Sequence, residues 1–275
     1  MSLPFQRHFK SLSVLLLAIA GFCLPSRADD APAVKPIQAL LITGGGFHDY
    51  TRQKQILTQG ISARANVQWT IFYEDGDTHH ELSIYQKPDW WKGYDIVVHN
   101  ECFADVTDTA FIDKALAAVR AGIPAVVIHC TLHTFRSLPT DQWREFIGMS
   151  SNHHGSQLPI HVEVLQPTNP IMTDFPPRWV TGPEELYSID KAMPNATVLA
   201  QAYSTEEKKE DPVIWTNMYM GKTRVFGTSM AHNDYTMQDP VYLSLVSRGL
   251  LWACDRLDAN GNPKPGYGPQ AAGKN

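Results

Sequence analysis

The sequence predicts an α/β fold with a mostly parallel β-sheet, helices on both faces, and an antiparallel extension in the second half of the chain. Two observations predict this fold. Between residues 37 and 129, short and almost entirely apolar runs alternate with longer helix-like segments, as in parallel sheets that are covered on both sides. In the second half, several strand-like runs follow one another without helices between them, which favours antiparallel pairing of neighbouring strands.

Turn and cap residues set the ends of the predicted elements in the first half. Gly44-Gly45-Gly46 ends the first strand, Thr107 is placed to cap a helix that Gly122 ends, and Pro124 leads into the next strand. The predicted strands are residues 37–43, 67–73, 94–99 and 125–129, and the predicted helices are residues 51–63 and 110–120.

The second half contains more strands and more turn residues. A short helix is expected at 143–149, and a last helix at 241–254 begins after Asp239-Pro240. The predicted strands are 160–165, 185–189, 197–202, 213–217 and 224–230, with loops at 167–183 and, fully exposed, at 206–211. Residues 29–257 are expected to form one domain, followed by a flexible tail at 258–275 that is rich in glycine, proline and asparagine.

Residues 1–28 have the pattern of a secretory signal peptide. Basic residues precede the apolar run 12–24, and Ser26-Arg27-Ala28 puts small residues at the −3 and −1 positions. The run is too short to serve as a membrane anchor. A lipoprotein interpretation through Cys23 is disfavoured because Phe22 is bulky. We expect cleavage near Ala28 and a periplasmic or secreted protein.

The mature chain of about 250 residues suits one large α/β domain. The net charge of −5 and the lack of any Lys/Arg cluster exclude a nucleic-acid-binding class, which needs a basic patch. Cys102, Cys130 and Cys254 remain after cleavage, and because three is odd, at least one thiol should stay unpaired. Which cysteines pair depends on their separation in the fold, so the pairing stays open.

Four histidines stand where strand-like runs end: His48, His99, His129 and His232. In an open α/β sheet, ligands bind beyond the carboxyl ends of the strands, so residues far apart in the sequence meet there. Imidazole is both a proton shuttle near neutral pH and a common metal ligand. The pattern therefore predicts one histidine-rich site at this edge of the sheet.

Three segments near these strand ends have two interpretations each. Gly44-Gly45-Gly46 either forms a tight turn or lets the backbone approach a ligand and directs His48, and its spacing fits no phosphate-binding fingerprint. His99-Asn100-Glu101 is either a site wall or a solvated loop. Residues 128–133 resemble a nucleophile elbow, in which Cys130 is either a nucleophile or, as we favour, a buried packing residue.

The remaining histidines and acids are less specific signals. His153-His154 and His79-His80 are expected in solvated loops, with a lid role for His153 or His154 left open, and His161 is expected to be structural. In Glu184-Glu185-Leu186-Tyr187, a carboxylate is either a general base or metal ligand, or a solvated acid.

Several motifs together resemble the trehalose-utilisation (ThuA-like) family over about residues 36–254. The segment 224–232, which ends at His232, is the most specific part of the resemblance. The other motifs are Gly44-Gly45-Gly46-Phe47-His48, Gly122-Ile123-Pro124, Glu184-Glu185-Leu186-Tyr187, Pro212-Val213-Ile214-Trp215, Asp239-Pro240 and Arg248-Gly249-Leu250-Leu251-Trp252-Ala253. The resemblance implies the fold of class I glutamine amidotransferases, which is a flavodoxin-like three-layer sandwich.

The resemblance also implies that the amidotransferase triad is degenerate. Amidotransferases carry a cysteine at the elbow and a His-Pro-Glu after a late strand. Here the elbow position looks like His129, with Cys130 one step on, and His232-Asn233-Asp234 stands at the later position. Glutaminase activity is therefore not expected. A one-residue shift of the alignment would put Cys130 at the elbow, which keeps a cysteine hydrolase as an alternative.

The family resemblance implies a carbohydrate-processing enzyme that acts on 3-keto-glycosides as a lyase, hydrolase or isomerase, and the signal-peptide pattern implies that it is exported. A partner sugar 3-dehydrogenase would supply this small-molecule substrate. Histidine acid–base chemistry would carry the reaction, with or without a divalent metal such as Zn²⁺, and no nucleotide cofactor is expected. The alternatives are a non-catalytic periplasmic sugar- or partner-binding module and a metal-dependent hydrolase of another substrate.

The residues of the predicted site fall into three groups. The expected catalytic residues are His129, His232 and Glu185, with His99 and Glu101 as second choices. The expected substrate-binding residues are Gly45, Gly46, Asn100, Glu101, Tyr187 and Trp215. The expected metal ligands are His48, His133 and His232.

Overall fold

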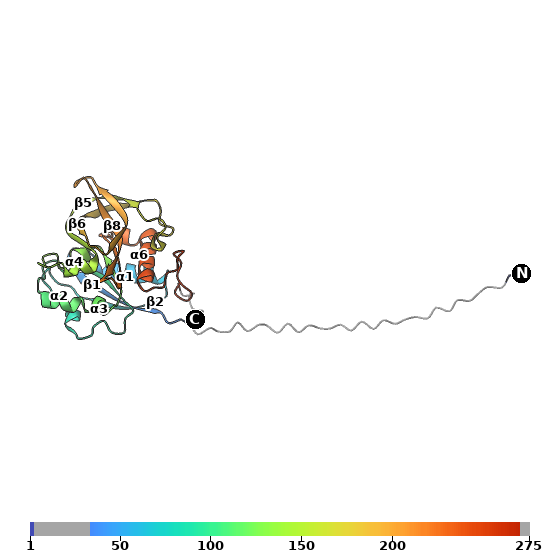
Figure 1. Cartoon of the computed structure of the whole chain (residues 1–275), viewed down its shortest axis with the longest axis horizontal. Helices are drawn as coiled ribbons and strands as arrows, with labels where there is room; N and C mark the ends of the chain where they lie inside the picture. The colour runs from blue at the N-terminus through green and yellow to red at the C-terminus, as the bar shows by residue number, and fades with distance from the viewer. Residues whose placement is uncertain (3–33, 270–275) are drawn as a thin grey trace. The chain divides into compact units, whose positions relative to one another are not determined.

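A mixed β-sheet forms the centre of the protein (Figure 1). The computed structural model describes residues 1–2 and 34–269, and in this part of the chain the sheet has nine strands in the order β2-β1-β3-β4-β9-β8-β7-β5-β6. The strands are β1 (Ile37–Gly45), β2 (Val67–Tyr73), β3 (Ile96–Cys102), β4 (Ala125–Ile128), β5 (Met149–Val164), β6 (Arg178–Ala192), β7 (Ala196–Ser204), β8 (Lys209–Tyr219) and β9 (Thr223–Thr228).

The sheet has a parallel half and an antiparallel half. Neighbours in the run β2-β1-β3-β4-β9 are all parallel. This is the 2-1-3-4-5 order of flavodoxin-like folds, with β9 as the fifth parallel strand. All pairs from β9 through β8, β7 and β5 to β6 are antiparallel. The predicted α/β fold with an antiparallel extension is confirmed, and in the described residues the extension adds four strands to the five of the parallel half.

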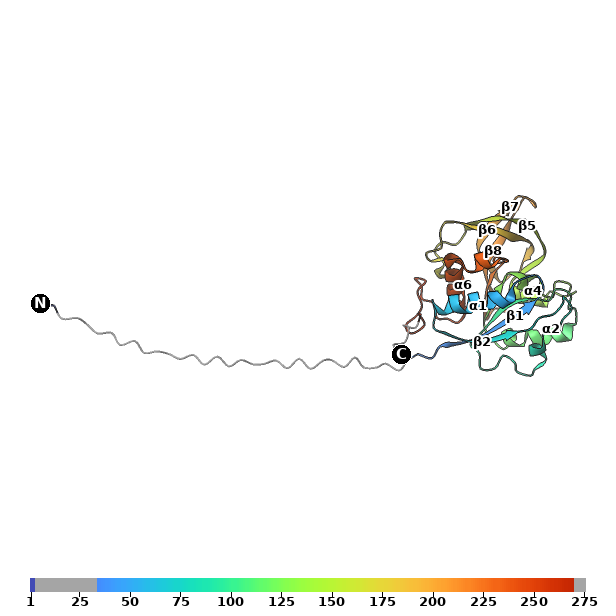
Figure 2. The same cartoon turned by 180° about the vertical axis from the view of Figure 1, so that it is seen from behind.

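Helices cover both faces of the parallel half and make a three-layer sandwich (Figure 2). Ala39 and Leu41 of β1 pack into a core with two helices, and Leu40 and Ile42 pack into the opposite core, as expected when side chains alternate across a buried strand. The first core contains α1 (Tyr50–Ser62) and α6 (Pro240–Ala253), and the second contains α2 (Thr109–Ala115), α3 (Ala117–Arg120) and α4 (Gln142–Ile147). The short elements are α5 (Asp234–Met237), η1 (Ser83–Gln86), η2 (His129–Leu132) and η3 (Pro170–Met172).

Aspartate side chains cap the helices α2 and α6. Asp239 caps α6 and Pro240 is its first residue, as predicted. The helix predicted at 110–120 is instead divided into α2 and α3 at Leu116. Its cap is Asp108 rather than Thr107, because the carboxylate of Asp108 accepts a hydrogen bond from the backbone N–H of Ala110.

Strands of the extension are longer than the sequence predicts. β5 contains His153 and His154, which are predicted in a loop, and β6 begins at Arg178, inside the predicted loop 167–183. Register shifts interrupt the pairing of β5 with β6, and these irregularities hide the alternation that marks a strand. The predicted exposed loop 206–211 is also wrong in part, because Asp211 lies in β8, is buried, and accepts a hydrogen bond from the backbone N–H of Ile189.

The two ends of the chain differ in how far the structure describes them. Apart from residues 1–2, the predicted signal peptide lies outside the described residues. Residues 258–269, predicted as flexible tail, make defined contacts: Asn66 donates hydrogen bonds to the carbonyls of Gly266 and Tyr267. Within the described residues, no helix combines the length and apolar character needed to cross a membrane.

Gly45 lets the ends of β1 and β3 approach closely, which gives a direct test of the fold. Its φ is +100°, and a Cβ there would overlap the backbone carbonyl of Cys102, whereas a Cβ at Gly46 would meet no atom within 4 Å. We expect Gly45→Ala to lower the free energy of unfolding by at least about 2 kcal/mol. The matched Gly46→Ala should change it by less than about 1 kcal/mol. Urea unfolding measures both, and equal losses would contradict the close-approach constraint.

Candidate functional site

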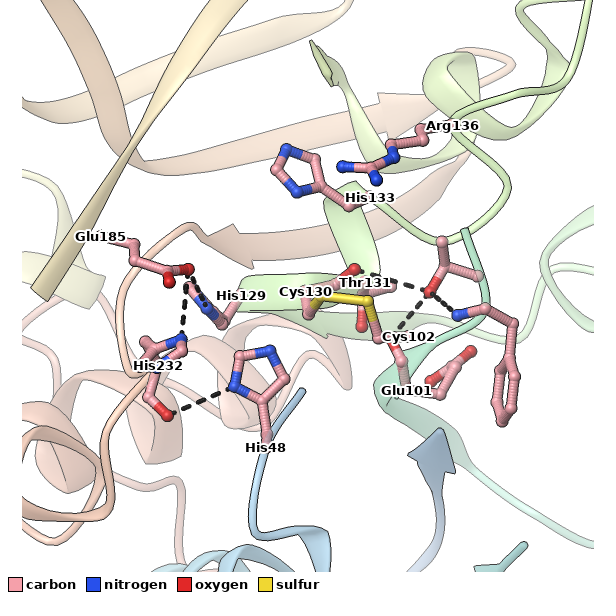
Figure 3. The surroundings of a disulfide bond; sticks show 12 residues. His48, Glu101, Cys102, His129, Cys130, Thr131, His133, Arg136, Glu185 and His232 are labelled. Atoms are coloured by element: carbon pink, nitrogen blue, oxygen red, sulfur yellow. Dashed lines mark hydrogen bonds and ion pairs between the residues drawn. A yellow bond between two sulfur atoms is a disulfide. The ribbon is translucent and has the colours of Figure 1, made fainter. Parts of the chain in front are cut away.

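Three of the four strand-end histidines meet at the carboxyl edge of the parallel half (Figure 3). His48 follows β1, His129 follows β4, and His232 follows β9. Their ring centroids are 4.6 to 5.5 Å apart, and one nitrogen of each ring lies within 4.8 Å of the others. The prediction of a histidine-rich site at this edge is therefore supported by the geometry, with the exception of His99.

Backbone carbonyls set the tautomers of two of these imidazoles. Nδ1 of His129 lies 2.7 Å from the carbonyl oxygen of Ser229, and Nδ1 of His48 lies 3.4 Å from that of His232. A carbonyl only accepts, so Nδ1 carries a hydrogen in both rings, and Nε2 is the nitrogen that holds the lone pair in the neutral form of each ring. Burial, together with the neighbouring His129 and His232, lowers the pKa of His48 to about 2. His48 is thus neutral at physiological pH.

Glu185 of β6 supplies the carboxylate of the cluster. Its Oε2 lies 3.1 Å from Nδ1 of His232, 3.5 Å from Nε2 of His154 and 3.6 Å from Nε2 of His129. Burial raises the pKa of Glu185, but its interactions with His129 and His232 outweigh this effect and hold the pKa well below its ordinary value. The hydrogen bond to Glu185 in turn raises the pKa of His232. The pair is therefore suited to hold a proton on His232.

His129 occupies the elbow at the end of β4. Its φ is +43°, the left-handed conformation of a sharp turn, and the 3₁₀ helix η2 starts at this residue. Cys130, one residue later, forms a disulfide with Cys102 at the end of β3, with a Cα–Cα separation of 5.3 Å. A disulfide-bonded cysteine has no thiol to attack a substrate, so the cysteine-hydrolase alternative is not supported. Cys254 is the free cysteine of the described residues, and burial raises its pKa to about 12.

Glu184 fixes the loop that carries His232, a role that the sequence does not indicate. Its carboxylate is fully buried and accepts hydrogen bonds from the backbone N–H groups of His232, at 2.8 Å, and Asn233, at 3.1 Å. The side-chain amide of Gln53 donates to the carbonyl of His232 at 3.1 Å. These contacts hold the loop after β9, and the sequence carries no pattern that reveals them.

A cavity of about 230 Å³ opens over the cluster. Tyr187, a predicted substrate-binding residue, lies in its wall: the ring stacks on His133 at 3.9 Å between centroids, and its hydroxyl lies 3.3 Å from Nε2 of His129. Burial and the charge of Glu185 raise the pKa of Tyr187 well above its ordinary value, so the phenol stays protonated and can donate. The lining residues are Phe47, His48, Cys102, Ala104, Cys130, His133, Arg136, His154, Glu185, Tyr187 and His232.

The predicted metal ligands need one correction. His133 lines the cavity but does not join the cluster, because it lies in the turn after η2 and its Nε2 faces Ser151 Oγ at 3.0 Å. The group that can hold a metal is His48, His129 and His232, with Glu185 beside it. His154, a member of β5 rather than of a loop, adds a fourth imidazole at the rim.

Four of the predicted substrate-binding residues lie away from the cavity, for different reasons. Trp215 is fully buried under Gly227 and donates to the carbonyl of Ile147. Asn100 is buried and bonds Thr43 and Gln53. Glu101 is buried with His99 and Tyr85, both within 2.9 Å of its Oε1. Gly45 is needed for the approach to β3, whereas Gly46 is half-buried beside the cavity residue Phe47.

The contact between Glu185 and His232 gives a prediction for the metal-free protein. In Glu185→Gln the negative charge is lost, so we expect the pKa of His232 to fall back towards the ordinary value. Histidine-selective NMR titration measures this pKa. Glu206→Gln is the matched control, because Glu206 is exposed and bonds Ser156, and it should leave His232 unaffected. An unchanged pKa in Glu185→Gln would mean that the carboxylate does not control this imidazole.

Comparison with known proteins places the chain in a family. Residues 38–253 match the family model described as trehalose utilisation, ThuA. The crystal structure of a protein described as ThuA-like from Parabacteroides merdae has 21% identity and a TM-score of 0.66, covering 80% of this chain and 90% of that one. A second such structure, from Bacteroides uniformis, has 17% identity and a TM-score of 0.63, covering 86% and 98%. No curated protein matches the sequence significantly. At these identities the two structures bear on the fold alone, and the family match carries the assignment: this chain belongs to the ThuA, or trehalose-utilisation, family.

Proposed function

We propose that the protein is an enzyme that cleaves or isomerises glycosides bearing a keto group at C3 of the sugar, by acid–base chemistry at His129, His232 and Glu185. The observation that carries the proposal is that His232 and Glu185 line one cavity of about 230 Å³, with His129 buried directly behind the cavity residues Glu185 and Tyr187. The family description supports a sugar as the substrate class. General acid–base catalysis needs a base and an acid close to the reacting bond, and in this proposal His129 and His232 take these roles.

The tautomers assign a role to each group. A keto group at C3 acidifies the proton on C2, and in this mechanism the proton goes to Nε2 of His129, which lies 3.3 Å from the hydroxyl of the cavity residue Tyr187. The electron pair from the C2–H bond forms an enolate at the C3 oxygen. When this enolate collapses, the bond from C1 to the leaving oxygen breaks and a C1–C2 double bond forms. The proton held on His232 by Glu185 goes to the leaving oxygen, and Tyr187 can donate a hydrogen bond to the enolate.

The same residues fit a divalent metal. Imidazole and carboxylate groups are the ligands that Zn²⁺ prefers, and His48, His129 and His232 would hold the ion with Glu185 beside them. The hydrogen bonds from Nδ1 of His48 and His129 to backbone carbonyls are the outer contacts that metal-bound histidines usually make. When bound, such an ion would polarise the keto oxygen.

Export and a supplying dehydrogenase remain part of the proposal. The Cys102–Cys130 disulfide supports an exported protein, because disulfides persist in oxidising compartments. The substrate must come from a reaction that oxidises a glycoside at C3, since nothing in the proposed chemistry creates the keto group.

The proposal is tested by following 3-keto-trehalose by NMR with the purified protein, with and without a chelator. We expect conversion, and its loss on chelation would show that the metal form is the active one. Conversion that survives chelation would assign the chemistry to the histidines and Glu185 alone. No conversion in either sample would contradict the proposal and favour a sugar-binding module.

Substitution of the elbow histidine separates catalysis from folding. We expect His129→Ala to lower kcat/KM for the keto-glycoside by about 10²- to 10⁴-fold, the usual contribution of a general base. His161→Ala is the control, because His161 is an exposed histidine of β5 that does not line the cavity. Retained turnover in His129→Ala, with an unchanged melting temperature, would remove His129 from the mechanism.

A further inference from the structure

A second hollow lies directly beside the cavity of the histidine cluster. It has a volume of about 570 Å³ and is lined by Phe47, His48, Asp49, His232, Asn233, Asp234 and Tyr235. Phe47, His48 and His232 line both spaces. The two spaces therefore meet at the imidazoles to which the proposed function assigns the chemistry. We call this second space the outer groove.

Phe47 is the most unusual residue of the outer groove. Its side chain is 64% exposed although it is a large apolar group, and its φ is +80°. A bulky side chain in the left-handed region is strained. Because the ring of Phe47 is mostly exposed, burial of its apolar surface does little to offset this strain. Tyr235, on α5, is a second aromatic ring of the groove and is 42% exposed. Two exposed aromatic rings thus border a space that opens onto the histidines.

The polar residues of the outer groove are suited to hydroxyl groups. Oδ1 of Asp49 accepts from the backbone N–H of Arg52, and Oδ2 of Asp234 lies 3.2 Å from Nε of the same arginine. Carboxylate oxygens accept more than one hydrogen bond, so both acids keep capacity for hydroxyl donors. Only Asp234 is paired with the guanidinium of Arg52, whereas Asp49 accepts from the backbone, so among the described residues the carboxylate of Asp49 has no paired cation and disfavours a phosphate or carboxylate ligand. Aromatic faces with a few placed acceptors suit a neutral sugar ring.

We propose that the outer groove is a second sugar subsite, which holds the leaving-group ring of a disaccharide while the oxidised ring occupies the inner cavity. This inference rests on the proposed function. It places the glycosidic bond at the junction of the two spaces, next to His48 and His232. The substrate class is then a disaccharide with a neutral second ring rather than a free keto-sugar.

The test compares the affinities of a disaccharide and a monosaccharide. Trehalose and glucose serve as unreactive probes, because neither carries the C3 keto group, and isothermal titration calorimetry measures both dissociation constants. We expect trehalose to bind at least about 10-fold more tightly than glucose. Phe47→Gly removes the ring and suits the positive φ, and it should bring the ratio of the two constants close to one. Phe47→Trp should keep the ratio, and Tyr235→Ala should reduce it.

Met220→Gly is the matched control. Met220 is also 64% exposed, also has a positive φ, of +50°, and lies outside both spaces, in the turn between β8 and β9. It should leave the ratio as in the wild type. A wild-type ratio near one, or a ratio unchanged in Phe47→Gly, would overturn the subsite while leaving the proposed function intact. If neither sugar binds although 3-keto-trehalose is converted, the subsite is overturned, and if 3-keto-trehalose is not converted either, the proposed function fails as well.

A kinetic readout separates this role from a structural one. With 3-keto-trehalose as substrate, Phe47→Gly should raise KM at least about 10-fold and change kcat much less, since the second ring contributes binding that is kept through the reaction. A fall in kcat with KM unchanged would contradict a subsite role for Phe47.

Discussion

The buried carboxylate of Glu184 connects the two halves of the sheet at the point where the site is formed. It comes from β6 at the far edge of the antiparallel half, yet it accepts the backbone N–H groups of His232 and Asn233 after β9 in the parallel half. A buried carboxylate is costly unless its oxygens are bonded, so this loop and this strand stabilise each other. The position of His232, and through its carbonyl the tautomer of His48, depends on this contact.

The location of the site could be predicted from the sequence because strand ends converge in an open α/β sheet. His48, His129 and His232 each follow a parallel strand, and this was enough to bring them together. The prediction that His99 joins this site is wrong because its strand, β3, continues to Cys102. Inside a strand, residues 99 and 101 share one face, and here that face is the helix-covered core, where His99 and Glu101 bond each other. A difference of two or three residues in where a strand ends therefore decides whether a side chain lies in the site or in the core.

Other features could not be predicted because they depend on distances across the fold. The pairing of Cys102 with Cys130 needs the ends of β3 and β4 side by side, and the sequence does not state this separation. His133 and His129 are four residues apart, but the 3₁₀ turn between them sends one ring towards Ser151 and the other into the cluster. Trp215 belongs to a motif that resembles the family, but it lies in β8 and its side chain is fully buried. Glu185 and Tyr187 line the cavity, and their catalytic and substrate-binding roles stay predictions.

The division of the sheet also separates two kinds of chemical group. The parallel half supplies the three imidazoles, on loops fixed by the flavodoxin-like frame, whereas the long β5–β6 pair supplies Glu185, Tyr187 and His154. Changes in that strand pair that leave Glu184 in place would exchange the acidic partner and the wall of the cavity without moving the imidazoles. Within such a scaffold, reactions can diverge through one hairpin while the histidine frame, and the folding of the parallel half, stay the same.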